Sequence, residues 1–228
     1  MLGKRLINTG GEVDITEECD FFGDGTGRYL WTFNEDFNDT CGRFTGWNYV
    51  AGSISSDSKF GIGSYSAGHL WRNNDDYGGG LSGGAFLSSI WAKGTAWSDN
   101  RTSYLWDCQG PKLYVNSSNS LRFQVGSSTQ GNITIGYDVS GLSSTEWHHI
   151  ATTIDSTTST YKLYVNGSEV ASGTYGGYII LQNLSQFSIG AYLTDNGDGW
   201  KGLLDQYRLF YRPNPTAADV LALYNEGQ

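Results

Sequence analysis

The stretch that decides the fold is EWHHIATTID at residues 146–155, followed by YKLYVNG at residues 161–167. Residues 161–165 alternate apolar and polar side chains in the way that a half-buried strand does. Asn166 and Gly167 then supply the two positive-φ positions that a type I′ turn requires, and the chain resumes with Glu169 and Val170. The pattern predicts a tight β-hairpin, preceded by another strand at residues 147–154.

Similar strand-like runs, separated by turn residues, recur along most of the chain. Further runs lie at residues 29–33, 69–72, 85–92, 102–108, 112–115, 121–125, 133–137, 187–193 and 203–211. About a dozen short strands at this spacing predict an all-β fold, an antiparallel sandwich or barrel. The composition agrees, because 228 residues with 32 Gly, 3 Pro, 8 Trp, 15 Tyr and 10 Phe favour short strands joined by tight turns.

The last segment of the chain reads as a helix. Pro213 and Pro215 end the preceding strand, and Thr216 with Asp219 three residues later forms a capping-box pattern. The apolar residues that follow share one helical face: Val220, Leu223 and Tyr224. We expect one short C-terminal helix, packed on the rim of the sandwich.

Charge and hydropathy exclude two classes of partner. The formal net charge is -9, and an acidic surface repels phosphate backbones, so we expect no nucleic-acid binding. No apolar run is long enough to cross a bilayer, and no apolar core follows the basic residues at the start, so we expect neither membrane insertion nor conventional secretion.

The cysteines are few and irregularly spaced. Cys19, Cys41 and Cys108 form no C-x-x-C pair, which argues against a disulfide framework and against a zinc site. We expect three free thiols, as in a protein assembled inside a cell, with a bridge between Cys19 and Cys41 as the alternative.

Residues 1–27 differ from the rest of the chain. They lack clean alternation and end in the flexible run GDGTG at residues 23–27. We interpret residues 1–27 as an N-terminal arm or linker and residues 28–228 as a single β-sandwich domain.

Three motifs, in the same order along the chain, resemble a known family. The hairpin segment resembles the W-H-H-V-A … L-Y-V-D-G hairpin of laminin-G-like and concanavalin A-like jelly-roll domains. GAFLSSIWAK at residues 84–93 resembles that family's F-T-I-S-A-W-V-K strand, and GLLDQYRLFYR at 202–212 with ALY at 222–224 resembles its G-x-I-D-E-V-R-I-Y-N-R segment. The resemblance covers roughly residues 28–226 and implies a jelly-roll fold; domains of this family bind glycans or proteins.

The N-terminal part resembles short laminin-G-like proteins that marine tailed phages encode, on GKRLINTG at residues 3–10, FGDGTG at 22–27 and NDTCG at 38–42. This resemblance implies a virion surface protein, either a capsid decoration or a fibre-associated module that contacts host glycans. Residues 1–27 would then dock on other virion proteins of the capsid or tail. We expect a homo-oligomer, for example a trimer, which suits capsid three-fold positions and fibres. The alternative is a free bacterial polysaccharide-binding, lectin-like module.

Related jelly-roll glucanases carry Glu-x-Asp-x-x-Glu on one strand face, where one carboxylate is the nucleophile and another the acid/base. The glutamates here lie outside any such strand, at positions 12, 17, 18, 35, 146, 169 and 226. We therefore expect no enzymatic activity. His148 and His149 are adjacent on a strand, so they point to opposite faces and cannot share a metal ion.

The family resemblance also implies a structural Ca²⁺. Its I-D-E-V-R aspartate, here Asp205, commonly meets the first strand-turn, which is residues 34–39 in this chain. Ca²⁺ takes six to eight oxygen ligands. The candidate ligands are Asp39, Asp205, Asn34 and Asp36. The alternative is that these side chains only cap the turn.

A loop before the last long strand is the candidate glycan site. It combines the oxygen-bearing side chains of Asp195, Asn196 and Asp198 with the aromatic ring of Trp200, which a sugar can stack on. The alternative is a solvated turn with Trp200 half-buried. Trp71, ahead of an Asn- and Asp-rich run, is a weaker candidate of the same kind.

Overall fold

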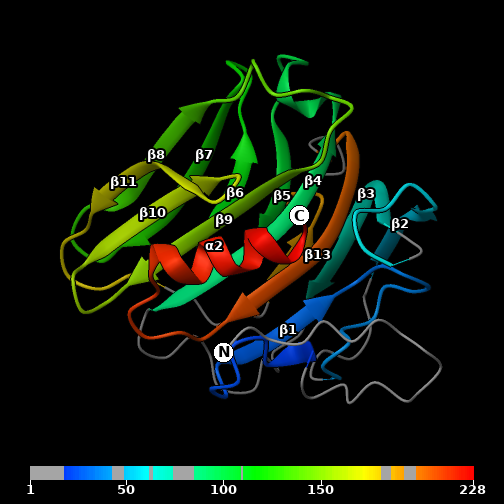
Figure 1. Ribbon diagram of the computed structural model, residues 1–228. Helices are drawn as coiled ribbons and strands as arrows, with labels where there is room; N and C mark the ends of the chain where they lie inside the picture. Colours follow the sequence, from blue (N-terminus) through cyan, green and yellow to red (C-terminus); the bar gives the residue numbers. More distant parts are fainter. Residues whose placement is uncertain are drawn as a thin grey trace.

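The computed structural model describes residues 18–42, 49–61, 64–73, 85–108, 110–180, 186–192 and 199–228 (Figure 1). Within these residues the elements are β1 (Gly27–Trp31), β2 (Tyr49–Ser55), β3 (Ser64–Asn73), β4 (Phe86–Gly94), the short 3₁₀ turn η1 (Thr95–Trp97), β5 (Ser103–Asp107), β6 (Lys112–Val115), β7 (Ser120–Ser127), β8 (Gly131–Asp138), β9 (His148–Asp155), β10 (Thr160–Val165), β11 (Ser168–Thr174), β12 (Gln186–Ile189), β13 (Gly202–Phe210) and the helix α2 (Ala217–Glu226).

The described strands form two antiparallel layers. Their hydrogen-bonded order is β11-β10-β9-β4-β13-β3-β12-β5-β6-β7-β8, with β1 on β13 and β2 on β3. β13 and β3 pair at only two positions, Leu203 with Ser66 and Leu204 with Tyr65. The order passes there from one layer to the other. The first layer consists of β11, β10, β9, β4, β13 and β1, and the second consists of β3, β12, β5, β6, β7, β8 and β2. The predicted antiparallel β-sandwich is confirmed.

Aromatic side chains fill the space between the layers. Phe86 of β4 meets Trp106 of β5, with ring centroids 6.3 Å apart, and Phe123 of β7 at 6.2 Å. Phe123 also meets Tyr161 of β10 at 6.0 Å. These side chains belong to one large cluster of buried residues, so the sandwich has a single main core.

The hairpin predicted from the opening stretch is present. β10 and β11 pair from Thr160 with Thr174 to Val165 with Ser168. Between them Asn166 and Gly167 both have positive φ, 49° and 79°. The Asn-Gly pair therefore forms the two-residue turn that the sequence predicted.

Helix α2 begins at the predicted capping box. The Thr216 side chain accepts a hydrogen bond from the Asp219 N–H at 3.2 Å, and Asp219 Oδ2 accepts one from the Thr216 N–H at 2.8 Å. The short C-terminal helix is thus confirmed, together with the signal that starts it.

The predicted position of this helix on the sandwich rim is wrong. Val220 and Leu223 are buried against Leu87, Ala151 and Tyr164, and Figure 1 shows α2 lying across β4, β9 and β10. The first layer carries apolar side chains on its outer face as well as on its core face. The helix covers that outer face because those side chains would otherwise be exposed to water.

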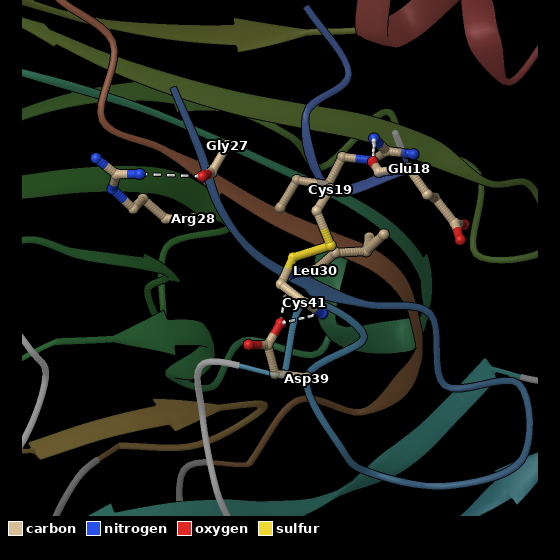
Figure 2. Close-up of a disulfide and its surroundings, with 8 residues drawn as sticks. Glu18, Cys19, Gly27, Arg28, Leu30, Asp39 and Cys41 are labelled. Atoms are coloured by element: carbon tan, nitrogen blue, oxygen red, sulfur yellow. Dashed lines mark hydrogen bonds between the residues drawn. A yellow bond between two sulfur atoms is a disulfide. The ribbon is translucent and has the colours of Figure 1, made fainter. Parts of the chain in front are cut away.

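Cys19 and Cys41 form a disulfide, with their Cα atoms 5.6 Å apart (Figure 2). The prediction of three free thiols is therefore wrong, and Cys108 is the free cysteine, buried. Asp39 brings the pair together by folding the chain back along β1. Its Oδ1 accepts hydrogen bonds from the Leu30 N–H at 2.9 Å and the Cys41 N–H at 3.1 Å.

The described end of the predicted arm packs on the sandwich. Arg208 Nη1 donates to the Glu18 carbonyl at 3.3 Å, and the Phe22 ring lies 4.9 Å from that of Phe210. Gly27 already belongs to β1. Residues 18–27 therefore pack against the sandwich, and the division of the chain after residue 27 stays a prediction. Residues 1–17 lie outside the described residues, and their role as an arm stays a prediction.

In the part of the chain that the structure describes, no helix has the length and apolar content needed to cross a membrane.

Candidate functional site

The predicted stacking role of Trp200 is wrong, because its side chain is only 1% exposed. Its ring packs edge-on against Trp97, with centroids 4.6 Å apart, and its Nε1–H donates to the Lys93 carbonyl at 3.3 Å. Trp200 is a core residue with a satisfied donor. The other loop candidates, Asp195, Asn196 and Asp198, lie outside the described residues.

Trp71 lies in β3, where its backbone pairs with Tyr49 of β2 and Ser188 of β12. The surroundings of its side chain are outside what the structure describes. Its part in ligand binding stays a prediction.

The predicted calcium ligands mostly hold the backbone of turns. Asp39 bonds two N–H groups beside the disulfide, as described above. Asp36 accepts from the Asn38 N–H through Oδ1 at 2.9 Å and from Asn38 Nδ2 through Oδ2 at 2.6 Å. Among the described residues, no three His, Cys, Asp or Glu side chains come together as metal ligands would. Ca²⁺ binding by Asp36 and Asp39 stays a prediction.

Asp205 fits better. It is fully buried, and its Oδ2 accepts from the N–H groups of Lys59 and Phe60, both at 2.9 Å. Its Oδ1 has no hydrogen-bond partner among the described residues. Burial raises the pKa of Asp205 to about 7, against the opposing effect of these hydrogen bonds. Asn34 lies close to the turn that contacts Asp205. A Cβ atom placed on Gly61, the residue after Phe60, would clash with Asn34 Oδ1.

The adjacent histidines of β9 have separate partners, as their alternation predicted. His149 is buried and its Nε2 lies 2.8 Å from Ser89 Oγ, whereas His148 Nε2 lies 3.0 Å from the Ser143 carbonyl. Burial lowers the pKa of His149 to about 3, so its imidazole is neutral at physiological pH. Both histidines serve packing.

The second layer presents a row of side chains that the sequence did not single out. Tyr104 of β5 pairs with Tyr114 of β6, Tyr114 pairs with Arg122 of β7, and Arg122 pairs with Gly136 of β8. Residues before and after them on β6 and β7 are buried in the core, while Tyr114 and Arg122 are half-buried. The row therefore runs across the outer face of the second layer. In Figure 1 this layer lies on the side of the sandwich away from α2.

The tyrosines of this row stack on one another. The rings of Tyr104 and Tyr114 are stacked, with centroids 5.0 Å apart and planes at 26°. The Tyr192 ring also contacts Tyr104, with centroids 5.0 Å apart and planes tilted by 40°. Packing between neighbours holds each ring in place and leaves the rings partly exposed.

The stack connects to the loop that the sequence predicted as a glycan site. Tyr192 precedes that loop, and Gly199, which follows it, forms a backbone bridge with Tyr104. The Trp200 N–H donates to the Gly190 carbonyl at 2.7 Å, which closes the loop at its base. Both described ends of the predicted loop are thus placed beside Tyr104.

Polar side chains form the next row on the same strands. Lys112 of β6 pairs with Gln124 of β7. Lys112 Nζ lies 3.7 Å from Asp107 Oδ2 and 5.0 Å from the centroid of the Tyr192 ring. Tyr114 Oη donates to Gln124 Oε1 at 3.5 Å. We call this surface the tyrosine face; it consists of Tyr104, Lys112, Tyr114, Arg122, Gln124 and Tyr192.

The tyrosine face keeps a neutral phenol at its centre. Burial raises the pKa of Tyr114, and the positive charge of Arg122 opposes that rise. The hydroxyl therefore stays protonated at physiological pH and can both donate and accept a hydrogen bond.

The superfamily model that matches this chain is described as concanavalin A-like lectin/glucanases (Laminin_G_3), and it aligns with residues 75–220, more than half of the sequence. The chain belongs to this superfamily. The match includes every residue of the tyrosine face. A comparison with curated proteins finds no match to this concanavalin A-like sequence.

Solved structures of toxin binding domains share the fold. The receptor-binding domain of a botulinum neurotoxin C/D mosaic serotype superposes with a TM-score of 0.67 and 14% identity, over 87% of this chain and 50% of that one. The binding domain of botulinum neurotoxin DC in complex with SialylT gives a TM-score of 0.68 and 15% identity, over 90% of this chain and 52% of that one. The binding domain of Paraclostridial Mosquitocidal Protein 1 gives a TM-score of 0.62 and 18% identity, over 87% of this chain and 51% of that one.

This concanavalin A-like chain spans about half the length of those domains. At such low identities the likeness concerns the fold alone.

Proposed function

We propose that this concanavalin A-like protein is a non-enzymatic glycan-binding domain, and that the tyrosine face holds the glycan. The observation that carries the proposal is the aligned row of Tyr104, Tyr114 and Arg122 across three strands. Stacked tyrosines supply rigid apolar contact area, and hydroxyl, amide and guanidinium groups beside them supply directional hydrogen bonds. A sugar, with apolar ring faces and a rim of hydroxyls, matches that combination.

The arrangement of carboxylates supports binding without hydrolysis. Strands β5 to β8 contain two carboxylates, Asp107 at the end of β5 and Asp138 at the end of β8. Three inter-strand steps of about 4.8 Å separate these strands by roughly 14 Å. Glycosidases place their two carboxyl groups about 5 to 9.5 Å apart, so this pair is too widely spaced for either the retaining or the inverting mechanism of hydrolysis.

Specific binding tests this proposal directly. On a glycan array the wild-type protein should bind a defined subset of glycans, and Tyr114→Ala should weaken that binding at least about tenfold, as truncation of a central aromatic contact does. Tyr178→Ala is the matched control, because Tyr178 is 70% exposed and lies outside the tyrosine face. Binding that Tyr114→Ala leaves unchanged would place the ligand elsewhere.

The finer proposal is that this domain acts on the surface of a tailed-phage virion, as a capsid decoration or a fibre-associated module. Its support is the N-terminal resemblance, and the Cys19–Cys41 disulfide suits a protein that works outside the reducing cytosol. The protein should then be found in purified particles and should be lost from them on deletion of residues 1–17. A chain secreted by a bacterium and absent from particles would favour the free polysaccharide-binding module.

Calcium binding at Asp205 and Asn34 is a separate proposal. Its support is the buried Oδ1 of Asp205, which lacks a partner among the described residues. An added Ca²⁺ ion at millimolar concentration should raise the melting temperature of the wild type and leave that of Asp205→Asn unchanged. An equal melting temperature of the wild type with Ca²⁺ and with a chelator would contradict it.

A further inference from the structure

We propose that the glycan held by the tyrosine face is acidic, and that Arg122 binds its carboxylate or sulfate group. This inference rests on the proposed function and names its substrate class. The guanidinium group is a rigid planar fork whose N–H donors match the oxygens of a carboxylate or sulfate in a bidentate contact.

Arg122 lies across the sheet and not out into solvent. A Cβ placed on Gly136, its partner on β8, would lie 2.7 Å from Arg122 Cδ, 2.9 Å from Nε and 3.0 Å from Nη1. The glycine thus leaves the space in which the arginine side chain rests on the strand. Its position against the β8 backbone restricts the guanidinium before a ligand arrives, which lowers the ordering cost of binding.

Among the residues that the structure describes, Arg122 has no partner for its charge. None of the ion pairs among the described residues includes it, and its Nε is buried without a hydrogen-bond partner. By contrast, Lys112 is paired with Asp107 on the same face. A half-buried cation with an unused donor, in a chain of net charge -9, is a local site for one anionic group.

The remaining charged and titratable groups of the tyrosine face leave this positive charge uncancelled. Lys112 and Asp107 offset each other, and burial raises the pKa of the Tyr114 phenol, so this hydroxyl carries no charge at neutral pH. The face therefore offers one net positive charge beside a tyrosine stack. An anionic substituent on a sugar ring next to Tyr114 would complement both.

The test compares two polysaccharides that share one backbone: polygalacturonate, which carries free carboxylates, and its fully methyl-esterified, uncharged form. By biolayer interferometry, the wild type should prefer the acidic polymer at least about tenfold, in line with a charge-assisted hydrogen bond. Arg122→Gln should abolish the preference, and added salt should weaken wild-type binding to the acidic polymer. Gly136→Ala keeps the charge but displaces the guanidinium, and should lower the preference as well.

Lys162→Gln is the charge-matched control, because it removes a cation that is paired with Glu169 in the other layer. Equal affinity for the charged and esterified polymers, with Arg122→Gln unchanged, would overturn the acidic-glycan inference and leave the proposed function standing. Failure to bind either of these polymers or any array glycan would overturn both. All variants are checked by thermal unfolding, so that loss of folding is distinguished from loss of the contact.

Discussion

Removal of the Cys19–Cys41 disulfide should destabilise the whole domain and not only its N-terminal end. The bond closes a loop of 22 residues that includes β1, and β1 pairs with the central strand β13. Cross-linking a loop of this length restricts the unfolded chain by about 3 kcal/mol in the chain-entropy model. For a domain of this size each kcal/mol shifts the melting temperature by roughly 2–4 °C, so the expected loss is about 6–12 °C.

The assay is differential scanning fluorimetry of the wild type, of the double variant Cys19→Ser/Cys41→Ser and of Cys108→Ser, each with and without reductant. Reductant should lower the melting temperature of the wild type to that of the double variant, and should lower that of Cys108→Ser by the same amount. It should have no effect on the double variant. Cys108 is the control because its thiol is buried and donates only to the Pro111 carbonyl.

Two results would refute this reasoning. Three free thiols in the denatured, unreduced protein, counted by alkylation and mass spectrometry, would show that the bond does not form. A melting temperature unchanged by reduction, once alkylation has shown the bond to be broken, would mean that β1 is held by its packing and hydrogen bonds alone.

Three further predictions follow from buried or capping side chains. Trp200→Ala should lower the free energy of unfolding, measured by urea denaturation, by about 3–5 kcal/mol, as for a core tryptophan. An effect near zero would contradict the burial of Trp200. Thr216→Ala removes the N-cap of α2 and should cost about 1 kcal/mol, measured in the same way; a loss below about 0.3 kcal/mol would contradict the capping box. The raised pKa of Asp205, about 7 in the folded protein, stabilises the fold below pH 4 and loses that contribution as pH rises toward 7. Stability should therefore fall more between pH 5 and pH 8 in the wild type than in Asp205→Asn, and parallel pH profiles would contradict the buried, protonated carboxyl.

Local signals in the sequence predicted the parts of the fold that local geometry determines. The turn at Asn166 and Gly167 and the cap at Thr216 each depend on a few neighbouring residues, and both are present. The predicted position of α2 was wrong because the position depends on which strands carry apolar side chains on both faces of the sheet. Only the assembled sheet shows that Leu87 and Ala151 need a cover on the outer side.

The candidate site was harder to predict because it depends on strand register. Alternation in the sequence marks Tyr114 and Arg122 as outward residues, but only the pairing shows that they align with Tyr104. An aromatic residue in a Gly- and Asp-rich loop fits an exposed platform and a buried anchor equally well, and Trp200 is the anchor. The signal for this site that the sequence offered was the outward position of Tyr104 and Tyr114 on adjacent predicted strands.

The most direct test of the central claim is NMR chemical-shift mapping of the ¹⁵N-labelled protein with an array-positive glycan. The account predicts that the largest amide shifts fall on Tyr104, Tyr114, Arg122 and their neighbours on β5 to β8. Shifts that concentrate around α2 or the β10–β11 hairpin, with β5 to β8 unchanged, would contradict it.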